Sequence, residues 1–282
     1  MSTMAESVVT VPAAEHATLQ RRMLTAAVLM PLALGLAWAG GLLWATAIAA
    51  LAALALWEWQ RMVCPSAWIT TVLAPLIAAA GCIALVVSGP GAALLVVATG
   101  AVASATMALR NVGVGKASVL AAGVVYIGLG TLALVHLREI PEAGFAALVW
   151  LMVGIWASDS GAYAAGKIIG GPRLAPRVSP NKTWAGLAGA MAGPALVGLV
   201  MGLVWPDGPA AGLLALLGLA IGLVGQAGDL VESAAKRHAG VKDSGQLVPG
   251  HGGVLDRVDA LLAAALFVAG LYLVRGEGLA WS

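Results

Sequence analysis

Residues 229–259, DLVESAAKRHAGVKDSGQLVPGHGGVLDRVD, form a polar segment between two long apolar runs. Nine of the chain's 28 Lys, Arg, Asp and Glu residues lie in this segment, together with His238 and His251. Of all 282 residues, 61% are hydrophobic and only 10% are charged. This composition excludes an ordinary soluble domain and predicts a polytopic membrane protein. Because polar groups at membrane depth are costly and are usually kept for function, the segment is a candidate functional site.

Helical spacing would bring several polar side chains of this segment together. If the apolar run before residue 229 continues as a helix, positions i, i+3, i+4, i+7 and i+8 share one face. These positions are Asp229, Glu232, Ser233, Lys236 and Arg237. The carboxylates suit a hard cation, and the two basic residues, about 12 Å further along at about 1.5 Å per residue, suit phosphates.

A glycine-rich turn over 249–253, PGHGG, precedes Asp256 and Asp259 at the start of the last apolar run. Its glycines would let backbone N–H groups approach a bulky anion. Carboxylates, basic residues and such a turn predict Mg²⁺-assisted chemistry on phosphates. From spacing alone, a solvated loop whose charges complement the helix dipoles stays open as the alternative.

A second polar segment covers residues 156–184, WASDSGAYAAGKIIGGPRLAPRVSPNKTW. Asp159 would cost about 2.5–3.5 kcal/mol at the bilayer centre unless it faces water, a cation or a metal. Residues 179–183 are predicted to open the next helix, with Ser179 or Asn181 as N-cap and free N–H groups for a phosphate. Ordinary capping is the alternative, and attraction to anionic headgroups would explain the basic residues. Those residues are Lys167, Arg173, Arg177 and Lys182.

Nine apolar runs of about twenty residues predict an all-α fold with about nine transmembrane helices. The runs are 23–40, 42–60, 68–88, 91–109, 117–137, 143–165, 183–204, 209–230 and 256–274. The first two are separated only by Gly40 and Gly41, which demands a tight turn. For the first run, a cleaved signal peptide is the alternative.

Charge asymmetry gives the expected orientation. With the N-terminus cytosolic, thirteen Lys and Arg residues fall on the cytosolic side, and only Arg138 and Arg275 fall outside. This bias places both polar segments at the cytosolic face. Residues 1–20 are expected to form a disordered cytosolic tail, and residues 21–282 a single transmembrane catalytic domain.

Three further residues look structural. Glu58, between Trp57 and Trp59, is predicted to be an interfacial acid paired with Arg61. Cys64 and Cys82 have no metal-ligand spacing and are predicted to be small buried hydrophobic residues.

The net charge of +2 indicates no nucleic-acid partner.

Motifs in both polar segments resemble those of the phosphatidate cytidylyltransferases, also called CDP-diacylglycerol synthases. They are SAAKR at 233–237, KD at 242–243, PGHGGVLDRVD at 249–259, DSGAY at 159–163 and SPNKTWAG at 179–186. Weaker similarity extends from about Arg22 to the C-terminus. The family usually has Lys where Asn181 stands and Glu where Ala185 stands, so no role of that acid is carried over.

The resemblance implies an enzyme of the cytoplasmic (inner) membrane that joins CTP to phosphatidate on the cytosolic side. CDP-diacylglycerol and pyrophosphate would be its products, and Mg²⁺ its cofactor, with a second cation as the alternative. It implies catalytic roles for Asp229, Lys236, Asp256 and Asp259, with Asp229 and Asp256 as metal ligands. It implies substrate binding by Ser179, Lys182, Thr183, Ser233, Arg237, His251, Gly252, Gly253 and Arg257. Asp159 and Glu232 are expected to lie next to the metal ligands and orient them without binding the ion themselves.

Two other functions stay open at this point. One is a related CTP-using enzyme that acts on another lipid phosphate or on a lipid alcohol. The other is an ion-coupled transporter, although its acids should lie deep within spans and not gather at one face. The expected partners are CTP, phosphatidate and membrane lipid, and monomer and homodimer both remain open.

Overall fold

The computed structural model describes residues 27–66, 68–205, 208–247 and 252–275. Within these ranges, seven helices are long and apolar enough to cross a membrane, and a shorter apolar helix covers Ala27–Ala39. The chain is therefore a multi-pass membrane protein, as its composition predicts. The expected tail, the start of the first predicted span and His251 lie outside the described residues.

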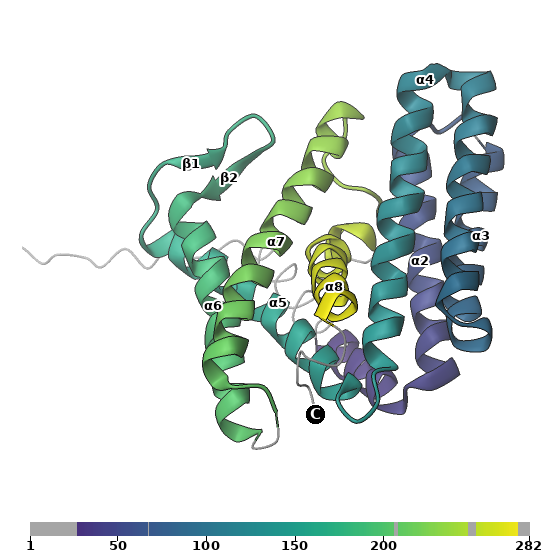
Figure 1. The fold of residues 1–282 in the computed structure, drawn as a ribbon. Coiled ribbons are helices and arrows are strands. Elements are labelled where there is room, and N and C mark those ends of the chain that lie inside the picture. Colours follow the sequence, from purple (N-terminus) through teal and green to yellow (C-terminus); the bar gives the residue numbers. More distant parts are fainter. Residues whose placement is uncertain (1–26, 67, 206–207, 248–251, 276–282) are drawn as a thin grey trace, which may run out of the picture.

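Figure 1 shows the elements in chain order. The long helices are α2 (Gly41–Val63), α3 (Trp68–Ser88), α4 (Pro90–Arg138), α5 (Gly144–Ile168), α6 (Trp184–Val204), α7 (Ala211–His238) and α8 (Leu255–Arg275). Two short strands, β1 (Arg173–Ala175) and β2 (Ser179–Thr183), lie between α5 and α6. Helix bounds agree with the predicted spans to within a few residues, except that α7 continues to His238 where 230 was predicted.

Helix α4 contains two of the predicted spans, 91–109 and 117–137, in one 49-residue element. The helical geometry is interrupted at Gly113, which has φ 80° and ψ 169°. Glycine takes such a conformation without the penalty that a Cβ imposes. Gly113 therefore divides α4 into two helical halves that correspond to the two predicted spans.

The helices form two groups with α8 between them (Figure 1). Helices α2, α3 and α4 pack together on one side, and α5, α6 and α7 on the other. Helix α8 contacts α4 and α2 in the first group and α7 and α5 in the second. In this view α8 is seen almost along its axis, so it crosses its neighbours. Its N-terminal end is thereby placed between elements that are far apart in sequence.

The predicted tight turn between the first two apolar runs is confirmed. Gly40 and Gly41 have φ values of 63° and 52°, the left-handed region that glycine tolerates best. The Arg138 guanidinium packs against Gly40, where a Cβ would overlap it. Arg138 also donates hydrogen bonds to the carbonyl oxygens of Ala37 and Trp38.

The predicted all-α class holds, but the segment between α5 and α6 contains a short hairpin that was not predicted. Strands β1 and β2 pair antiparallel, with Arg173 opposite Thr183 and Ala175 opposite Ser179. A helix is disfavoured here because prolines remove backbone donors and clash with the preceding turn. They are Pro172, Pro176 and Pro180.

The N-cap of α6 is also not where it was predicted. Ser179 and Asn181 lie within β2, and Thr183 is the residue that caps the helix. Its Oγ1 accepts a hydrogen bond from the Gly186 N–H at 3.0 Å. Capping by a Thr side chain satisfies one of the free amides at a helix start.

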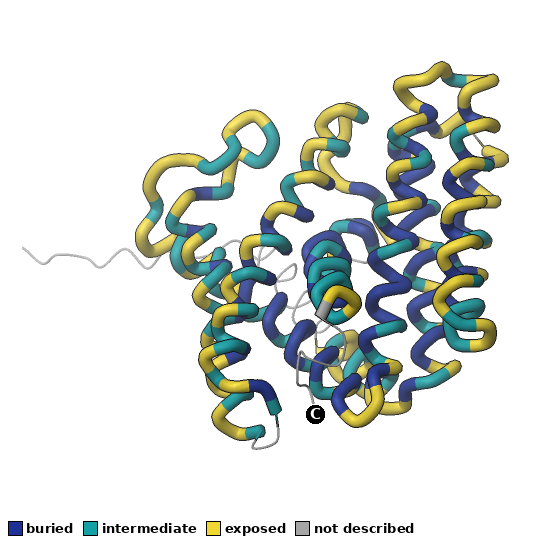
Figure 2. The backbone as a smooth tube through the Cα atoms, viewed as in Figure 1, coloured by how far each residue is buried: buried dark blue, intermediate teal, exposed yellow. Residues whose placement is uncertain are grey.

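Burial follows this arrangement (Figure 2). Large side chains such as Trp150, Leu56 and Leu262 are fully buried in the core around α8. Leu95 and Leu203 are more than half exposed, as expected for side chains that face lipid tails. Cys64 and Cys82 are buried free cysteines, as predicted.

Candidate functional site

The two polar segments meet at one end of the bundle, where β2 lies against α7. Lys182 Nζ is 2.7 Å from Asp229 Oδ2. Arg237 Nε donates to the carbonyl oxygen of Val178 at 3.3 Å. The Asp229 side chain is 31% exposed, so this acid is reachable from outside the core, whereas the Lys182 Nζ itself is buried. A cation from one segment thus neutralises an acid of the other.

Helix α7 continues without a break through the polar residues, so the predicted common face exists. Ser233 Oγ donates to Asp229 Oδ1 at 3.2 Å. One turn further, Lys236 Nζ is 3.3 Å from Glu232 Oε2. Both are i, i+4 pairs of the kind that a helix brings together. Arg237 instead donates to the carbonyl oxygens of Val178, in the hairpin formed by β1 and β2, and of Val241.

Asp256 joins α8 to α7 through the same lysine. Lys236 Nζ is 2.6 Å from Asp256 Oδ1. The other oxygen, Oδ2, accepts the backbone N–H groups of Gly253 at 2.9 Å and Ser244 at 3.0 Å. The side chains of Lys236 and Asp256 are only 11% and 6% exposed. A pair this buried is costly to break, because either partner alone would be left as an uncompensated charge.

The turn before α8 differs from the expected phosphate cradle. Gly253 was expected to offer its N–H to an anion, but this N–H is donated to Asp256. Gly252 has φ 88°, a conformation that favours glycine. The neighbouring His251 was also expected to bind substrate, and it lies outside the described residues.

Two of the predicted acids lie inside the protein. Glu232 is 1% exposed and Asp259 is 8% exposed. The Tyr126 hydroxyl donates to the backbone oxygen of Asp259 at 2.8 Å. Helices α7 and α8 come close here, since a Cβ on Gly228 would lie 3.1 Å from that same oxygen. Asp259 is therefore about as buried as the Asp256 side chain and much less exposed than Asp229.

The remaining predicted residues lie on α5, on β2 and on the first turn of α8. Asp159 on α5 is exposed and within electrostatic range of Asp229, Lys182 and Arg257. Arg257 is exposed on the first turn of α8. Thr183 is buried and its oxygen is used in the helix cap. Ser179 is half-buried in β2.

Whether the acids fit a metal depends on which oxygens are available. In the part of the chain that the structure describes, no group of three or more His, Cys, Asp and Glu residues is arranged to hold a metal ion. Both oxygens of Asp256 are engaged by nitrogen donors. Asp229 is the more exposed acid. Mg²⁺ commonly uses one or two protein carboxylates and takes its other ligands from substrate phosphates and water, so Asp229 fits such an ion.

The prediction for Glu58 is wrong. Glu58 is buried and accepts hydrogen bonds from Ser244 Oγ and from the backbone N–H groups of Val254 and Leu255. Arg61 lies instead over the Trp57 ring, 4.8 Å from its centroid. Sequence reasoning missed the connection of Glu58 to the site and gave Ser244 no role. The feature of the sequence that could have indicated this connection is an acidic residue inside an apolar run.

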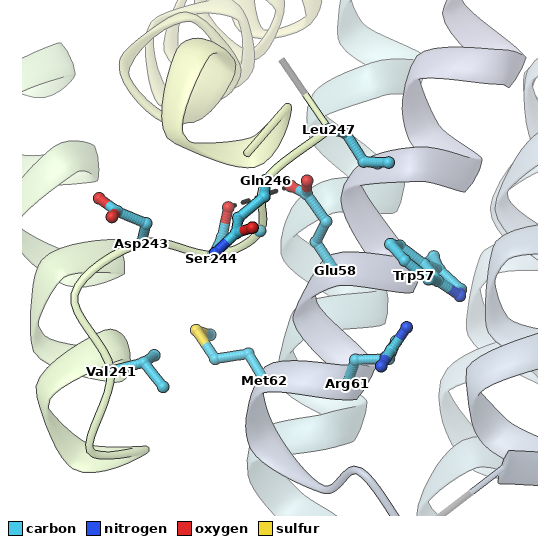
Figure 3. Close-up of a pocket in the computed structure, with 10 residues that line it drawn as sticks. Trp57, Glu58, Arg61, Met62, Val241, Asp243, Ser244, Gln246 and Leu247 are labelled. Carbon is cyan, nitrogen blue, oxygen red and sulfur yellow. Dashed lines mark hydrogen bonds between the residues drawn. The ribbon is translucent and has the colours of Figure 1, made fainter. Parts of the chain in front are cut away.

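Glu58 also borders a cavity of about 410 Å³ between the end of α2 and residues 241–247 (Figure 3). Trp57, Arg61 and Met62 line it from α2, and Asp243 and Gln246 from the loop. Ser244 lines this cavity and also contacts Asp256. The cavity is therefore next to the Lys236–Asp256 pair.

Fold and site together define a multi-pass membrane protein that gathers cations and carboxylates at one end of its bundle, an arrangement suited to phosphates. The chain belongs to the cytidylyltransferase family, whose model matches residues 20–274. It is accordingly a nucleotidyltransferase.

Individual relatives agree with this membership. The chain is 40% identical over 256 residues to a phosphatidate cytidylyltransferase of Brucella suis, covering 88% of this chain and 90% of the relative. It is 38% identical over 269 residues to one of Pseudomonas aeruginosa, covering 92% and 99% of the two chains. A Bacillus subtilis protein of the same name is 41% identical over 144 residues, 51% of this chain and 54% of the relative.

Proposed function

We propose that this protein transfers the cytidylyl group of CTP to phosphatidate, forming CDP-diacylglycerol and pyrophosphate for phospholipid synthesis. Family membership and the names of the similar proteins support this substrate pair. The observation that carries the proposal is the meeting of the two polar segments in the Lys182–Asp229 pair. It places cations from the hairpin and from α7 around one region, as a triphosphate and a lipid phosphate require.

The proposed reaction needs no strong general base. An oxygen of the phosphatidate phosphate is already anionic at neutral pH and attacks the α-phosphorus of CTP. A new P–O bond forms, and the bond from the α-phosphorus to the bridging oxygen of the leaving group breaks. Pyrophosphate leaves with that electron pair. Positioning and charge neutralisation then supply most of the rate enhancement, as is general for phosphoryl transfer.

The basic residues are proposed to neutralise the phosphates. Arg257 is exposed near Asp159, where it can reach an incoming nucleotide, and Lys182, whose Nζ is buried against Asp229, would have to turn toward the phosphates. Lys236 is held by Asp256, so its ammonium group is fixed before substrate arrives. Hydroxyl, guanidinium and backbone amide groups nearby are proposed to shape the phosphate pocket. They belong to Ser179, Thr183, Ser233, Arg237 and Gly252.

We propose Asp229 as the principal protein ligand of Mg²⁺. When bound, Mg²⁺ neutralises the phosphate oxygens and withdraws charge from the reacting phosphorus. Asp229 would exchange part of its contact with Lys182 for the ion. Asp256 is the second proposed ligand, and it could serve as one only by releasing Lys236 or the backbone N–H groups it accepts.

The membrane arrangement of the proposal is nine spans with a cytosolic N-terminus. Counting the two halves of α4 separately would give eight spans, and the predicted run 23–40, of which the structure describes the helix Ala27–Ala39, would be the ninth. The excess of basic residues favours the cytosolic side for the site, where CTP is available. The bacterial relatives favour the cytoplasmic (inner) membrane. The acyl chains of phosphatidate can then stay in lipid while its headgroup reaches the cations.

The direct test is product analysis with purified full-length protein in lipid nanodiscs. Cytidine-labelled CTP, phosphatidate and Mg²⁺ should yield a lipid-soluble cytidine product and one pyrophosphate per turnover. A lipid kinase would instead release CDP and leave no cytidine in the lipid fraction. Replacing phosphatidate by diacylglycerol is the matched control, and product formation from diacylglycerol alone would contradict the proposed acceptor.

A further inference from the structure

Glu58 is a buried carboxylate that connects α2 to the loop and helix that carry Asp256. Its side chain is 1% exposed. Oε1 accepts the Val254 N–H at 3.0 Å, and Oε2 accepts the Leu255 N–H at 2.9 Å and the Ser244 hydroxyl at 3.0 Å. These contacts span 186 to 197 residues of sequence. Figure 3 shows Glu58 and Ser244 pointing toward each other beside the cavity.

In the part of the chain that the structure describes, the Glu58 carboxylate is held by hydrogen-bond donors and pairs with no cation. Among the described residues, the ion pairs of the site use Asp229, Glu232 and Asp256 as acids. Arg61, less than one turn further along α2, lies over Trp57. The two backbone donors to Glu58 belong to the start of α8, where the helix dipole favours a negative charge. Hydrogen bonds to an ionised acceptor are stronger than neutral ones, so this contact fixes the α8 N-terminus.

Ser244 links Glu58 to the proposed reaction site. Its Oγ is 3.0 Å from Glu58 Oε2 and 3.1 Å from Asp256 Oδ2. A hydroxyl has one hydrogen to donate. Asp256 Oδ2 already accepts two backbone N–H groups, one of them from Ser244 itself. The arrangement that satisfies both acids therefore donates the Ser244 hydroxyl to Glu58, and a continuous chain of contacts runs from Glu58 through Ser244 and Asp256 to Lys236.

The loop is also shaped around this carboxylate. A Cβ on Gly245 would overlap Glu58 Oε1. A Cβ on Gly253 would lie 2.6 Å from Glu58 Oε2. Ordinary contacts are not this short, so a side chain at either position would displace the Glu58 carboxylate from its present hydrogen bonds. The need for glycine at 253, predicted from phosphate binding, is explained here by a protein contact.

We infer that Glu58 is a positioning residue: it holds Ser244 and the first turn of α8 so that Asp256 keeps the Lys236 ammonium group in place. Its effect on turnover rests on the proposed function. Its effect on the geometry of Lys236 does not, and can be measured without any reaction. Glutamine at this position offers one acceptor oxygen, so it would set an N–H group against one of the α8 amides.

The test compares Glu58→Gln with two other variants of the full-length protein in nanodiscs. Glu58→Gln should lower kcat about 10- to 100-fold while KM for CTP stays largely unchanged, because a reacting group is misplaced and not removed. Ser244→Ala should change kcat in the same direction by less, and adding it to Glu58→Gln should cause little further loss. The matched control is Gln60→Ala, which removes a buried polar side chain of the same helix that bonds to Leu120. It should lower thermal stability without this fall in kcat.

A second readout is the rate at which acetic anhydride modifies Lys236, measured by mass spectrometry against the exposed Lys242. Glu58→Gln and Ser244→Ala should both speed modification of Lys236, and Gln60→Ala should not. Two results would overturn the inference. One is a kcat for Glu58→Gln that is no lower than that of Gln60→Ala at equal stability. The other is an unchanged rate of Lys236 modification. If the parent forms no lipid-linked cytidine, the proposed function fails and the Lys236 rate still decides the role of Glu58. If Glu58→Gln does not fold, kcat and the rate of Lys236 modification are both measured on Ser244→Ala alone.

Discussion

At the scale of single residues, the two acids first assigned to a metal have different surroundings. Asp229 is partly exposed and holds one lysine and one hydroxyl. Asp256 is nearly buried, and its two oxygens are filled by an ammonium group and backbone amides. An exposed carboxylate can accept a metal at little cost, whereas a buried one must first lose its hydrogen bonds. The two acids should therefore affect catalysis differently.

Asp229→Asn should lower activity about 10²-fold and raise the Mg²⁺ concentration for half-maximal activity about tenfold, because it removes the proposed ligand. Asp256→Asn should also lower kcat but raise that Mg²⁺ concentration by less, because the oxygens of this second proposed ligand are already engaged by Lys236 and backbone N–H groups. The measurement is a Mg²⁺ titration of initial rates at saturating CTP. Glu142→Gln, in the exposed turn between α4 and α5, is the control and should behave as the parent. Equal shifts in Mg²⁺ dependence for both aspartate variants would contradict the principal role of Asp229.

At the scale of elements, the position of the hairpin depends on how closely α5 and α6 approach. A Cβ on Gly161 would overlap the carbonyl oxygen of Gly189, and a Cβ on Gly189 would overlap that of Gly161. Small residues at such a crossing let helix backbones touch in a membrane, where no hydrophobic effect drives helix association. Because β1 and β2 connect these two helices, their contact fixes where Lys182 meets Asp229.

Gly189→Ala and Gly270→Ala make the same substitution in two helices with different surroundings. Nothing lies within 4 Å of a Cβ built on Gly270. There, alanine should be neutral or stabilising by up to about 1 kcal/mol, its advantage in helix propensity. At Gly189 the overlap should outweigh that gain and destabilise the protein by about 1–3 kcal/mol. Thermal unfolding in one detergent, followed by tryptophan fluorescence, compares the pair, and equal melting temperatures would rule out the close contact.

At the scale of the whole molecule, the polar groups gather at one end because the ends of several helices meet there. The hairpin, the C-terminal part of α7, the end of α2 and the start of α8 all contribute. The turn between α4 and α5 lies at the opposite end of the bundle in Figure 1. A membrane across the bundle would separate these two ends, so the proposed orientation can be tested with probes on each.

Cysteine labelling should place these ends on opposite sides of the membrane. With Cys64 and Cys82 replaced by alanine, Arg173→Cys and Gln246→Cys should react with an impermeant maleimide only in inverted vesicles. Glu142→Cys should react in spheroplasts. All three positions are exposed, so failure to label reflects the membrane and not burial. Labelling of positions 173 and 246 from different sides would contradict a single cytosolic site.

Sequence by itself determined the membrane class, most helix bounds and the shared face of α7. These depend on local regularities: a run of about twenty apolar residues spans a bilayer, and i, i+4 spacing is fixed by helix geometry. The Gly40–Gly41 turn could be read for the same reason, because it is set by two adjacent residues. The motif resemblance then gave the family, which the comparisons confirmed.

Only the tertiary structure decided the partners of Glu58, the use of the Gly253 N–H and the exposure that distinguishes Asp229 from Asp256. Glu58 was predicted to pair with a neighbour three residues away, but its actual donors lie 186 to 197 residues further on. Local spacing contains no information on contacts at that distance. The partner of a buried carboxylate is set by which donors the packed helices bring to it, because a buried charge must be satisfied wherever the fold places it.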